Sequence, residues 1–225
     1  MLLGTAANVA AIVLGTLLGL LLRRRLPKRI IQISTQGLGL VTALIGAQMM
    51  ITAQNVLIVL VSVVAGAVVG ELIRIEDRLD ALGARIEKRF RRRHGTFAKA
   101  FVTSSLLYCI GPIAILGALQ DGLRGDYSIL LTKSGLDGIA SVAFASTLGI
   151  GVIFSAIPVL AYQGSITIAA STFQPYLTKS VINGMTSTGG LLILGIALNI
   201  LHVTKIRVGN MLPAVIFAAI LSAFL

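Results

Sequence analysis

The side chains best able to do chemistry in this sequence are polar residues that lie within or beside long apolar runs. A polar group that faces lipid hydrocarbon costs free energy, so we expect these side chains to face the interior of a helix bundle. There they could form hydrogen bonds between helices or line a pathway for a small solute or ion, and both interpretations stay open. The candidate pathway residues are Asn8, Gln36, Gln48, Lys133, Asp137, Gln163, Asn183, Thr186, Asn199 and Asn210.

Asp137 is the one carboxylate that adjoins the start of an apolar run on the expected outer side. In one interpretation it marks a helix N-terminus, where an acid is favoured and can accept hydrogen bonds from backbone N–H groups. Lys133, one helical turn earlier, could then pair with it in water for little gain in stability. In the other interpretation Asp137 faces the bundle below the surface and takes up a proton or a cation. The sequence alone favours the first interpretation.

Two pairs of glycines are predicted to break helices where apolar runs begin, namely Gly37 with Gly39 and Gly189 with Gly190. Broken helix starts could direct backbone N–H groups toward a shared site. Each pair is followed by an apolar run, a turn with an asparagine and a further apolar run. This weak likeness is compatible with an internal repeat and also with chance.

Two other pairs of glycines are spaced four residues apart, Gly15 with Gly19 and Gly66 with Gly70. Each pair lies on one helix face and lets another backbone approach closely. The spacing favours packing within the bundle over a dimer interface, although a homo-oligomer stays open.

No residue pattern in the sequence indicates catalysis, a cofactor or a metal site. His94 and His202 have no His or carboxylate at metal-ligand spacing, and no Ser–His–acid set or Gly-rich phosphate loop is present. The single cysteine, Cys109, lies in an apolar run and is most simply a small core residue. We therefore expect a protein that is not an enzyme.

Composition predicts an all-α membrane protein. The chain has 225 residues, of which 56% are hydrophobic and 12% are charged, whereas a soluble domain carries about 25% charged residues. The net charge of +11 does not indicate nucleic-acid binding, because 14 of the 19 bases lie in residues 23–29 and 74–99 and there is no Trp for stacking. Basic loops between apolar runs are typical of the cytoplasmic side of membrane proteins.

Hydropathy predicts a bundle of seven transmembrane spans. They are residues 5–22, 40–52, 56–72, 101–119, 138–160, 189–201 and 211–225. A turn at Gln54-Asn55 joins the second and third spans, and Gly111-Pro112 should kink the fourth. Residues 163–187 are polar and contain Pro175 and Lys179, so we expect a short, broken element there. If this element crosses the membrane there are eight spans, and Lys205 and Arg207 then lie on the same side as the other basic loops.

The long polar segment at residues 71–99 has helical periodicity, with acids first and bases last. It predicts an amphipathic helix that either lies on anionic lipid headgroups or packs its apolar stripe on its own protein. It divides the chain into a three-span unit (1–72), a cytoplasmic linker (73–99) and a second unit of four spans (100–225). Because residues 23–29 and 74–99 flank one hairpin, both should be cytoplasmic, with the N-terminus outside.

Several strings together resemble a known family. They include Gln36-Gly37-Leu38-Gly39-Leu40, Gly70-Glu71, Tyr162-Gln163-Gly164-Ser165, Arg207-Val208-Gly209-Asn210, and the longest, Gln120-Asp121-Gly122-Leu123-Arg124-Gly125-Asp126-Tyr127. Over nearly its whole length the chain resembles the domain of unknown function 554 family, the YqgA/YdfK-like proteins. The resemblance implies a polytopic bacterial inner-membrane protein and supplies no mechanism.

The polar residues within a bundle favour a transporter or channel for a small solute or ion. The alternative is a membrane sensor or scaffold that acts through the basic amphipathic helix. An intramembrane enzyme ranks third. The partners expected are the lipid bilayer and anionic headgroups at residues 74–99, and no nucleic acid.

Overall fold

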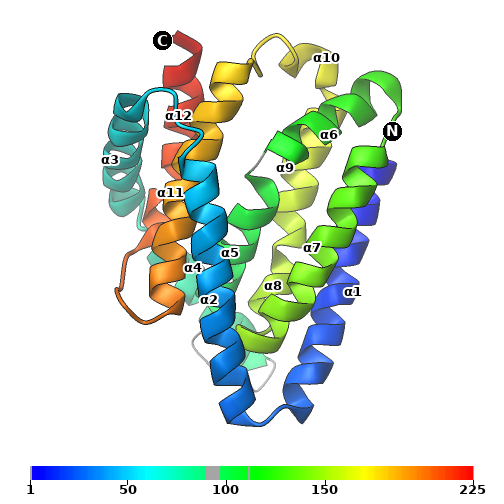
Figure 1. Ribbon diagram of the computed structural model, residues 1–225, viewed down its shortest axis with the longest axis vertical. Helices are drawn as coiled ribbons and strands as arrows, with labels where there is room; N and C mark the ends of the chain where they lie inside the picture. The colour runs from blue at the N-terminus through cyan, green and yellow to red at the C-terminus, as the bar shows by residue number, and fades with distance from the viewer. Residues whose placement is uncertain (1, 90–96, 111, 225) are drawn as a thin grey trace.

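The computed structural model describes residues 2–89, 97–110 and 112–224. Every regular element in these ranges is helical, and the helices form one elongated bundle (Figure 1). This outcome agrees with the all-α prediction, and the differences lie in where the helices begin and end.

The first two helices are longer than predicted. Helix α1 spans Leu3–Arg25 and α2 spans Lys28–Met50, joined at Leu26 and Pro27. Gly37 and Gly39 therefore lie inside α2, and Gly189 and Gly190 lie inside α11, so the predicted helix breaks are wrong. Three of the four glycines lie at helix contacts instead: Gly190 meets the backbone of α2 at Gly46 and Met50, Gly39 meets Leu201, and Gly189 meets Ile110.

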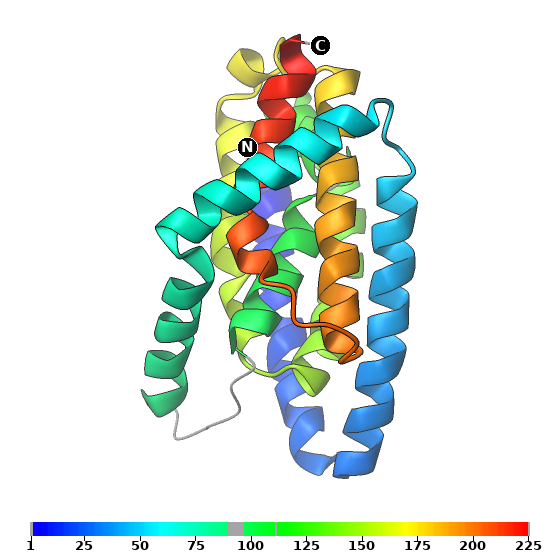
Figure 2. The same cartoon turned by 90° about the vertical axis from the view of Figure 1, so that its left-hand side faces the viewer.

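Helix α3 spans Val56–Ile73, and its N-terminus is capped by the side chain of Asn55, which accepts from the N–H of Leu57 at 3.0 Å. The predicted turn before it is confirmed. Arg74 adopts a left-handed conformation (φ 57°), and α4 (Ile75–Arg89) then leaves in a new direction (Figure 2). Leu79 packs on the hydrophobic core, so part of the apolar stripe of α4 faces its own protein.

The predicted amphipathic helix is shorter than residues 71–99. Lys99 belongs to the next helix, α5. The predicted basic residues Arg91, Arg92 and Arg93, together with Phe90 and His94, lie outside the described residues.

The predicted kink in the fourth span is confirmed. Helix α5 spans Phe97–Cys109 and α6 spans Pro112–Arg124, and the two are bent by 56°. Proline is well suited to the first residue of a helix, where its missing N–H leaves no hydrogen bond unmade.

The predicted span 138–160 is wrong. Helix α7 covers Ser128–Thr147, and the chain then turns at Gly149, which has a positive φ of 99° that glycine adopts without strain. It returns as α8 (Gly151–Phe154) and α9 (Ala156–Ile168). Lys133 and Asp137 lower the hydropathy of the first half of α7, so a prediction from hydropathy places the start of the helix too late. In the structure the two side chains form an ion pair with each other.

The prediction that residues 163–187 form a broken element is confirmed, because they do not form one continuous helix. They comprise the end of α9, the short helix α10 (Ala170–Phe173), a connection and the start of α11. Helix α11 spans Lys179–Ile200 and is capped by Thr178. A 3₁₀ turn, η1 (Val208–Met211), and α12 (Pro213–Phe224) complete the described chain.

Five helical segments are long and apolar enough to cross a membrane: Leu3–Arg25, Lys28–Met50, Val56–Ile73, Gly151–Ile168 and Lys179–Ile200. The bent pair of α5 and α6 raises the number to six. The described residues thus give five or six candidate spans, fewer than the seven predicted.

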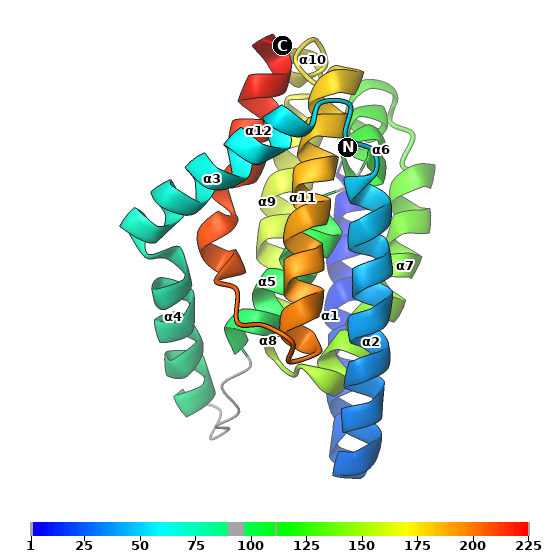
Figure 3. The same ribbon diagram turned by 60° about the vertical axis from the view of Figure 1, so that its left-hand side comes forward.

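Helices pair across the molecule: α1 packs on α7, α2 on α11, and α3 on α12. The spaced glycines lie at these contacts, because Gly15 and Gly19 meet α7 while Gly66 and Gly70 meet α12 and η1. Packing within the bundle, the favoured interpretation of both pairs, is therefore what the structure shows. Figure 3 shows α3 and α4 on the side of the molecule away from α1 and α7.

Large apolar side chains cover much of the outer surface, especially along α1 and α3, while many polar residues are buried. This inverted distribution suits a lipid surrounding. Figure 2 shows the α1–α2 turn, the lower end of α4 and the loop after α11 toward the same end of the molecule, which we call the basic end. The membrane side that the basic end faces stays a prediction.

Candidate functional site

The candidate site is a cluster of buried polar side chains around Lys133 and Asp137 of α7. The two residues are 6% and 7% exposed, and the Lys133 ammonium donates a hydrogen bond to Oδ2 of Asp137. Asp137 lies in the middle of α7, not at its N-terminus, so the favoured helix-terminus interpretation is wrong. The pair is shielded from water, which makes each charge dependent on the other.

Two amide side chains from other helices complete the centre of the cluster. Asn8 of α1 donates from Nδ2 to Asp137 Oδ2 at 3.0 Å and to Gln163 Oε1 of α9 at 3.2 Å. Asn8 and Gln163 are fully buried. Within the described residues, Asn8 Oδ1 and Gln163 Nε2 have no hydrogen-bond partner. Buried polar atoms are seldom left in this condition, so one acceptor and one donor here are free for a water or a ligand.

The helix contacts explain why these side chains meet. Gly15 and Gly19 allow α1 to approach α7 so closely that an added Cβ would strike the α7 backbone at Gly138 and Val142. This approach brings Asn8 to the depth of Asp137.

The cluster extends to the bend between α5 and α6 through Tyr108, a residue near the end of α5. The Tyr108 hydroxyl shares a 2.8 Å hydrogen bond with Ser141 Oγ of α7, and the Lys133 ammonium lies 5.9 Å from the centre of the tyrosine ring. At that distance the ring face attracts the cation. The break in α5–α6 therefore borders the charged pair.

Some members of this region were missed from sequence. Tyr108 lies in an apolar run and gave no signal, but Ser141 follows Lys133 and Asp137 at helical spacing and could have been found. Asp121, which was not among the predicted pathway residues, lies in α6 and is 1% exposed, with Oδ2 unpartnered in the described part of the chain.

Other predicted pathway residues lie elsewhere. Gln36 and Gln48 are exposed on α2, so the expectation that they face the interior is wrong. Asn183 lines a separate cavity of about 130 Å³ with Gln54, Asn55 and Ser222. Thr186 is buried on α11, and its hydroxyl has no partner in the described ranges.

Asn199 and Asn210 shape the basic end and do not join the cluster. Asn199 bonds through its side chain to the N–H and C=O of Ile206, which orders the loop after α11. Asn210 donates to Glu71 and accepts from the N–H of Glu76 at 2.7 Å. These contacts bring the Gly70-Glu71 and Arg207–Asn210 strings together, although they are far apart in sequence.

Comparison with known proteins gives a family without a described activity. The family described as "Protein of unknown function (DUF554)" matches residues 3–223. The chain is 35% identical to "Uncharacterized protein YqgA" of Escherichia coli (strain K12), over 99% of this chain and 97% of that protein. It is 31% identical to "Uncharacterized membrane protein YdfK" of Bacillus subtilis (strain 168), over 95% and 92%. No solved structure matches. The chain therefore belongs to the DUF554 family, and its apolar helices and this relative identify it as a multi-pass membrane protein.

Proposed function

We propose that this protein transports or conducts a small solute or ion, with the cluster around Lys133 and Asp137 as its polar centre. The observation that carries the proposal is a buried ion pair in the middle of a helix, beside two amides with unused hydrogen-bonding atoms. Ionisable groups inside a bundle are costly, and in membrane proteins they mark ion and substrate pathways by default.

A purely structural role explains the cluster less well. Helix association here has other sources, because glycine contacts join α1 to α7 and α2 to α11. A pair retained only for stability could be replaced by apolar residues with little loss. The free donor on Gln163 and the free acceptor on Asn8 would be satisfied by a polar ligand or by water.

The bend between α5 and α6 supports a transport role. Broken helices border the binding sites of many transporters, because backbone groups at the break are not used within the helix. Tyr108 links this break to Lys133. A change at the bend would therefore alter the surroundings of the ion pair.

The alternative is a sensor or scaffold that acts through α4. The exposed bases Arg74, Arg78 and Arg85 give this helix a surface for anionic lipid headgroups. However, Glu76 ties the start of α4 to η1, which limits its independent movement.

The test compares flux through purified protein in liposomes, using pH- and potential-sensitive dyes for ions and labelled compounds for solutes. Replacing the pair with Lys133→Met and Asp137→Asn together removes both charges and keeps an acceptor for Asn8. We expect this double variant to fold and to lose flux. Gln48→Leu, on the exposed face of α2, is the control and should keep wild-type flux. A monodisperse double variant with wild-type flux would refute the proposal.

A further inference from the structure

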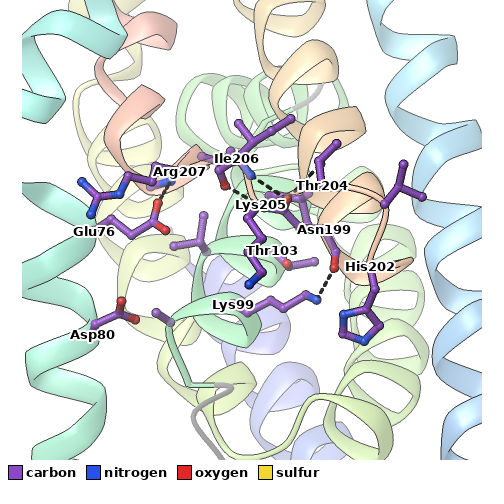
Figure 4. A pocket seen from close by; sticks show the side chains of 16 residues that line it. Glu76, Asp80, Lys99, Thr103, Asn199, His202, Thr204, Lys205, Ile206 and Arg207 are labelled. Carbon is purple, nitrogen blue, oxygen red and sulfur yellow. Dashed lines mark hydrogen bonds between the residues drawn. The ribbon is translucent and has the colours of Figure 1, made fainter.

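A second site lies at the basic end, in a cavity of about 830 Å³ between α4, α5, α11 and the loop after α11 (Figure 4). Ligand sites commonly have volumes of about 300–1,000 Å³. The walls combine apolar side chains, such as Val102 and Ile196, with charged groups of both signs. The cavity is separate from the Lys133–Asp137 cluster, since none of that cluster's residues lines it.

Two lysines supply the positive wall. The ammonium of Lys99 donates to the carbonyl oxygen of Asn199 at 2.7 Å, and Lys205 extends from the loop into the same space (Figure 4). Among the described residues, neither ammonium has a carboxylate partner. Lys99 is half-buried, so its charge is poorly compensated by water and favours an anion.

Thr103 adds a neutral donor beside these lysines. Its side chain is buried and lines the cavity. The hydroxyl has no hydrogen-bond partner in the described part of the molecule. Two ammonium groups and a hydroxyl are the donors that an oxyanion accepts from.

Two acids from α4 supply the opposite wall. Figure 4 shows Glu76 and Asp80 facing the lysines from the other side of the cavity. Glu76 accepts from the N–H of Gly209 at 3.0 Å, and Asp80 forms no ion pair within the described ranges. Desolvation raises the pKa of both carboxyls by more than the Arg207 guanidinium, which also lines the cavity, lowers it. A cation on this side would stabilise them.

We propose that this cavity binds a small zwitterion, whose oxyanion contacts Lys99, Lys205 and Thr103 and whose ammonium group faces Glu76 and Asp80. A simple anion would leave Arg207 as the nearby cation for both acids, and a second anionic group would be repelled by them. Both a soluble zwitterion and the headgroup of a zwitterionic phospholipid carry this chemistry. The inference does not depend on transport, because binding is measurable without flux.

The test is calorimetric titration of the full chain, in nanodiscs of phosphatidylglycerol, with phosphoethanolamine. Inorganic phosphate and ethanolamine are the matched probes, each of which carries charge of one sign only. We expect phosphoethanolamine to bind at least about tenfold more tightly than either, since each half lacks one charged contact. Equal binding of inorganic phosphate and phosphoethanolamine would overturn the zwitterion assignment.

Variants locate the binding in this cavity. Lys99→Gln and Asp80→Asn should each weaken phosphoethanolamine binding about tenfold, and Thr103→Val, which preserves shape, should weaken it measurably. Lys28→Gln, at an exposed lysine at the start of α2, is the control and should leave binding unchanged. Wild-type affinity in folded Lys99→Gln and Thr103→Val proteins would refute the site.

Two further experiments distinguish a lipid headgroup from a soluble ligand, and test the binding site separately from the proposed transport. Phosphatidylethanolamine in the nanodiscs should compete with the soluble probe if lipid headgroups reach the cavity, and leave its affinity unchanged if only soluble ligands do. The Lys133→Met and Asp137→Asn double variant should bind phosphoethanolamine as the wild type does. Loss of flux without loss of binding would therefore leave both proposals standing independently.

Discussion

Lys133 and Asp137 lie one helical turn apart and act as one neutral unit inside the bundle. Each charge is tolerated because the other is present, while Asn8 adds a hydrogen bond to the carboxylate. Removing one member leaves a buried charge without a partner, which is more damaging than removing both. An exposed ion pair of this protein differs in this respect, because water compensates the charge that remains when one partner is removed.

We predict that Asp137→Asn and Lys133→Met, made singly, each lower the free energy of unfolding by about 3–5 kcal/mol. The double variant should lose clearly less than either single variant, because no uncompensated charge remains. Each variant is heated in mixed micelles, and the fraction that stays folded is measured by size-exclusion chromatography. These fractions give the order of stability of the variants. Lys28→Gln, at an exposed lysine at the start of α2, is the control and should leave stability nearly unchanged. A double variant less stable than both singles would contradict this account.

A second prediction at this scale concerns Glu76 at the start of α4. Desolvation by burial raises the pKa of its carboxyl, despite the hydrogen bond from the N–H of Gly209. The folded protein thus binds a proton more readily than the unfolded chain, so stability falls as pH rises through the raised pKa, above the ordinary glutamate value of about 4.3. Glu76→Gln keeps an acceptor for Gly209 and should flatten this slope. Melting temperatures across this pH range measure it.

Two comparisons check the sign of that effect. The pKa of the neighbouring Asp80 is also raised by desolvation, so Asp80→Asn should flatten the remaining slope. The pKa of Asp126 is lowered by hydrogen bonds from Ser128, so its contribution is lost as pH falls, and Asp126→Asn should act in the opposite sense. A steeper slope in Glu76→Gln would show that the carboxylate is favoured in the fold.

Sequence reasoning found the centre of the site because polarity within an apolar run is a strong signal. It named Asn8, Lys133, Asp137 and Gln163, which meet in the structure. It also named Gln36 and Gln48, which are exposed, because polarity along one helix does not say which face is covered. The pairing of residues from α1, α7 and α9 depends on the packing of distant segments, and no local pattern encodes it.

At the scale of elements, the turn between α2 and α3 was predictable because Gln54-Asn55 is a local signal, whereas the packing of α2 on α11 and of α3 on α12 was not. The bend at Pro112 was predictable for the same reason. The limits of α7 were not, because the hydropathy argument treats Lys133 and Asp137 as surface residues when they are paired in the interior. The glycines of α2 and α11 were misread as breaks since a helix contact and a helix start use the same residue type.

A third prediction uses two glycines of α2 that differ only in surroundings. A Cβ added at Gly46 would lie 2.7 Å from the backbone nitrogen of Leu194 and 2.9 Å from the Gly190 carbonyl oxygen, while one at Gly37 meets nothing within 4 Å. Gly46→Ala should therefore separate α2 from α11 and destabilise the protein by about 1–3 kcal/mol. Gly37→Ala should be neutral or stabilise it by up to about 1 kcal/mol, because alanine favours the helix.

Melting of the two alanine variants side by side measures this difference. Since both changes add one methyl group to the same helix, intrinsic helix propensity cancels in the comparison. Equal stabilities would mean that the contact between α2 and α11 is loose. Destabilisation confined to Gly37→Ala would place the contact on the other face of α2.

At the scale of the whole molecule, large apolar side chains cover much of the surface, and the interior holds the polar cluster around Lys133 and Asp137. The charged residues outside the cluster gather near the helix ends, so they report how the bundle sits in the membrane. Helices α2 and α11 pack side by side, and the loop after α11 lies toward the same end as the α1–α2 turn (Figure 2). This arrangement matches the sequence alternative in which Arg207 shares a side with residues 23–29.

The last prediction tests that arrangement in intact bacterial cells with an impermeant thiol reagent. In a Cys109→Ala background, single changes Lys28→Cys, Val203→Cys and Lys179→Cys sample the α1–α2 turn, the loop after α11 and the start of α11; all three positions are exposed. Because basic loops are retained in the cytoplasm, the first two should be labelled only after the membrane is opened, and the third in intact cells. If the first two positions are labelled from outside and the third is protected, the orientation in the membrane is the reverse of the one predicted, while the fold still agrees with the result. Opposite behaviour of the first two would contradict the fold itself, because the antiparallel packing of α2 and α11 requires the α1–α2 turn and the loop after α11 to share one side.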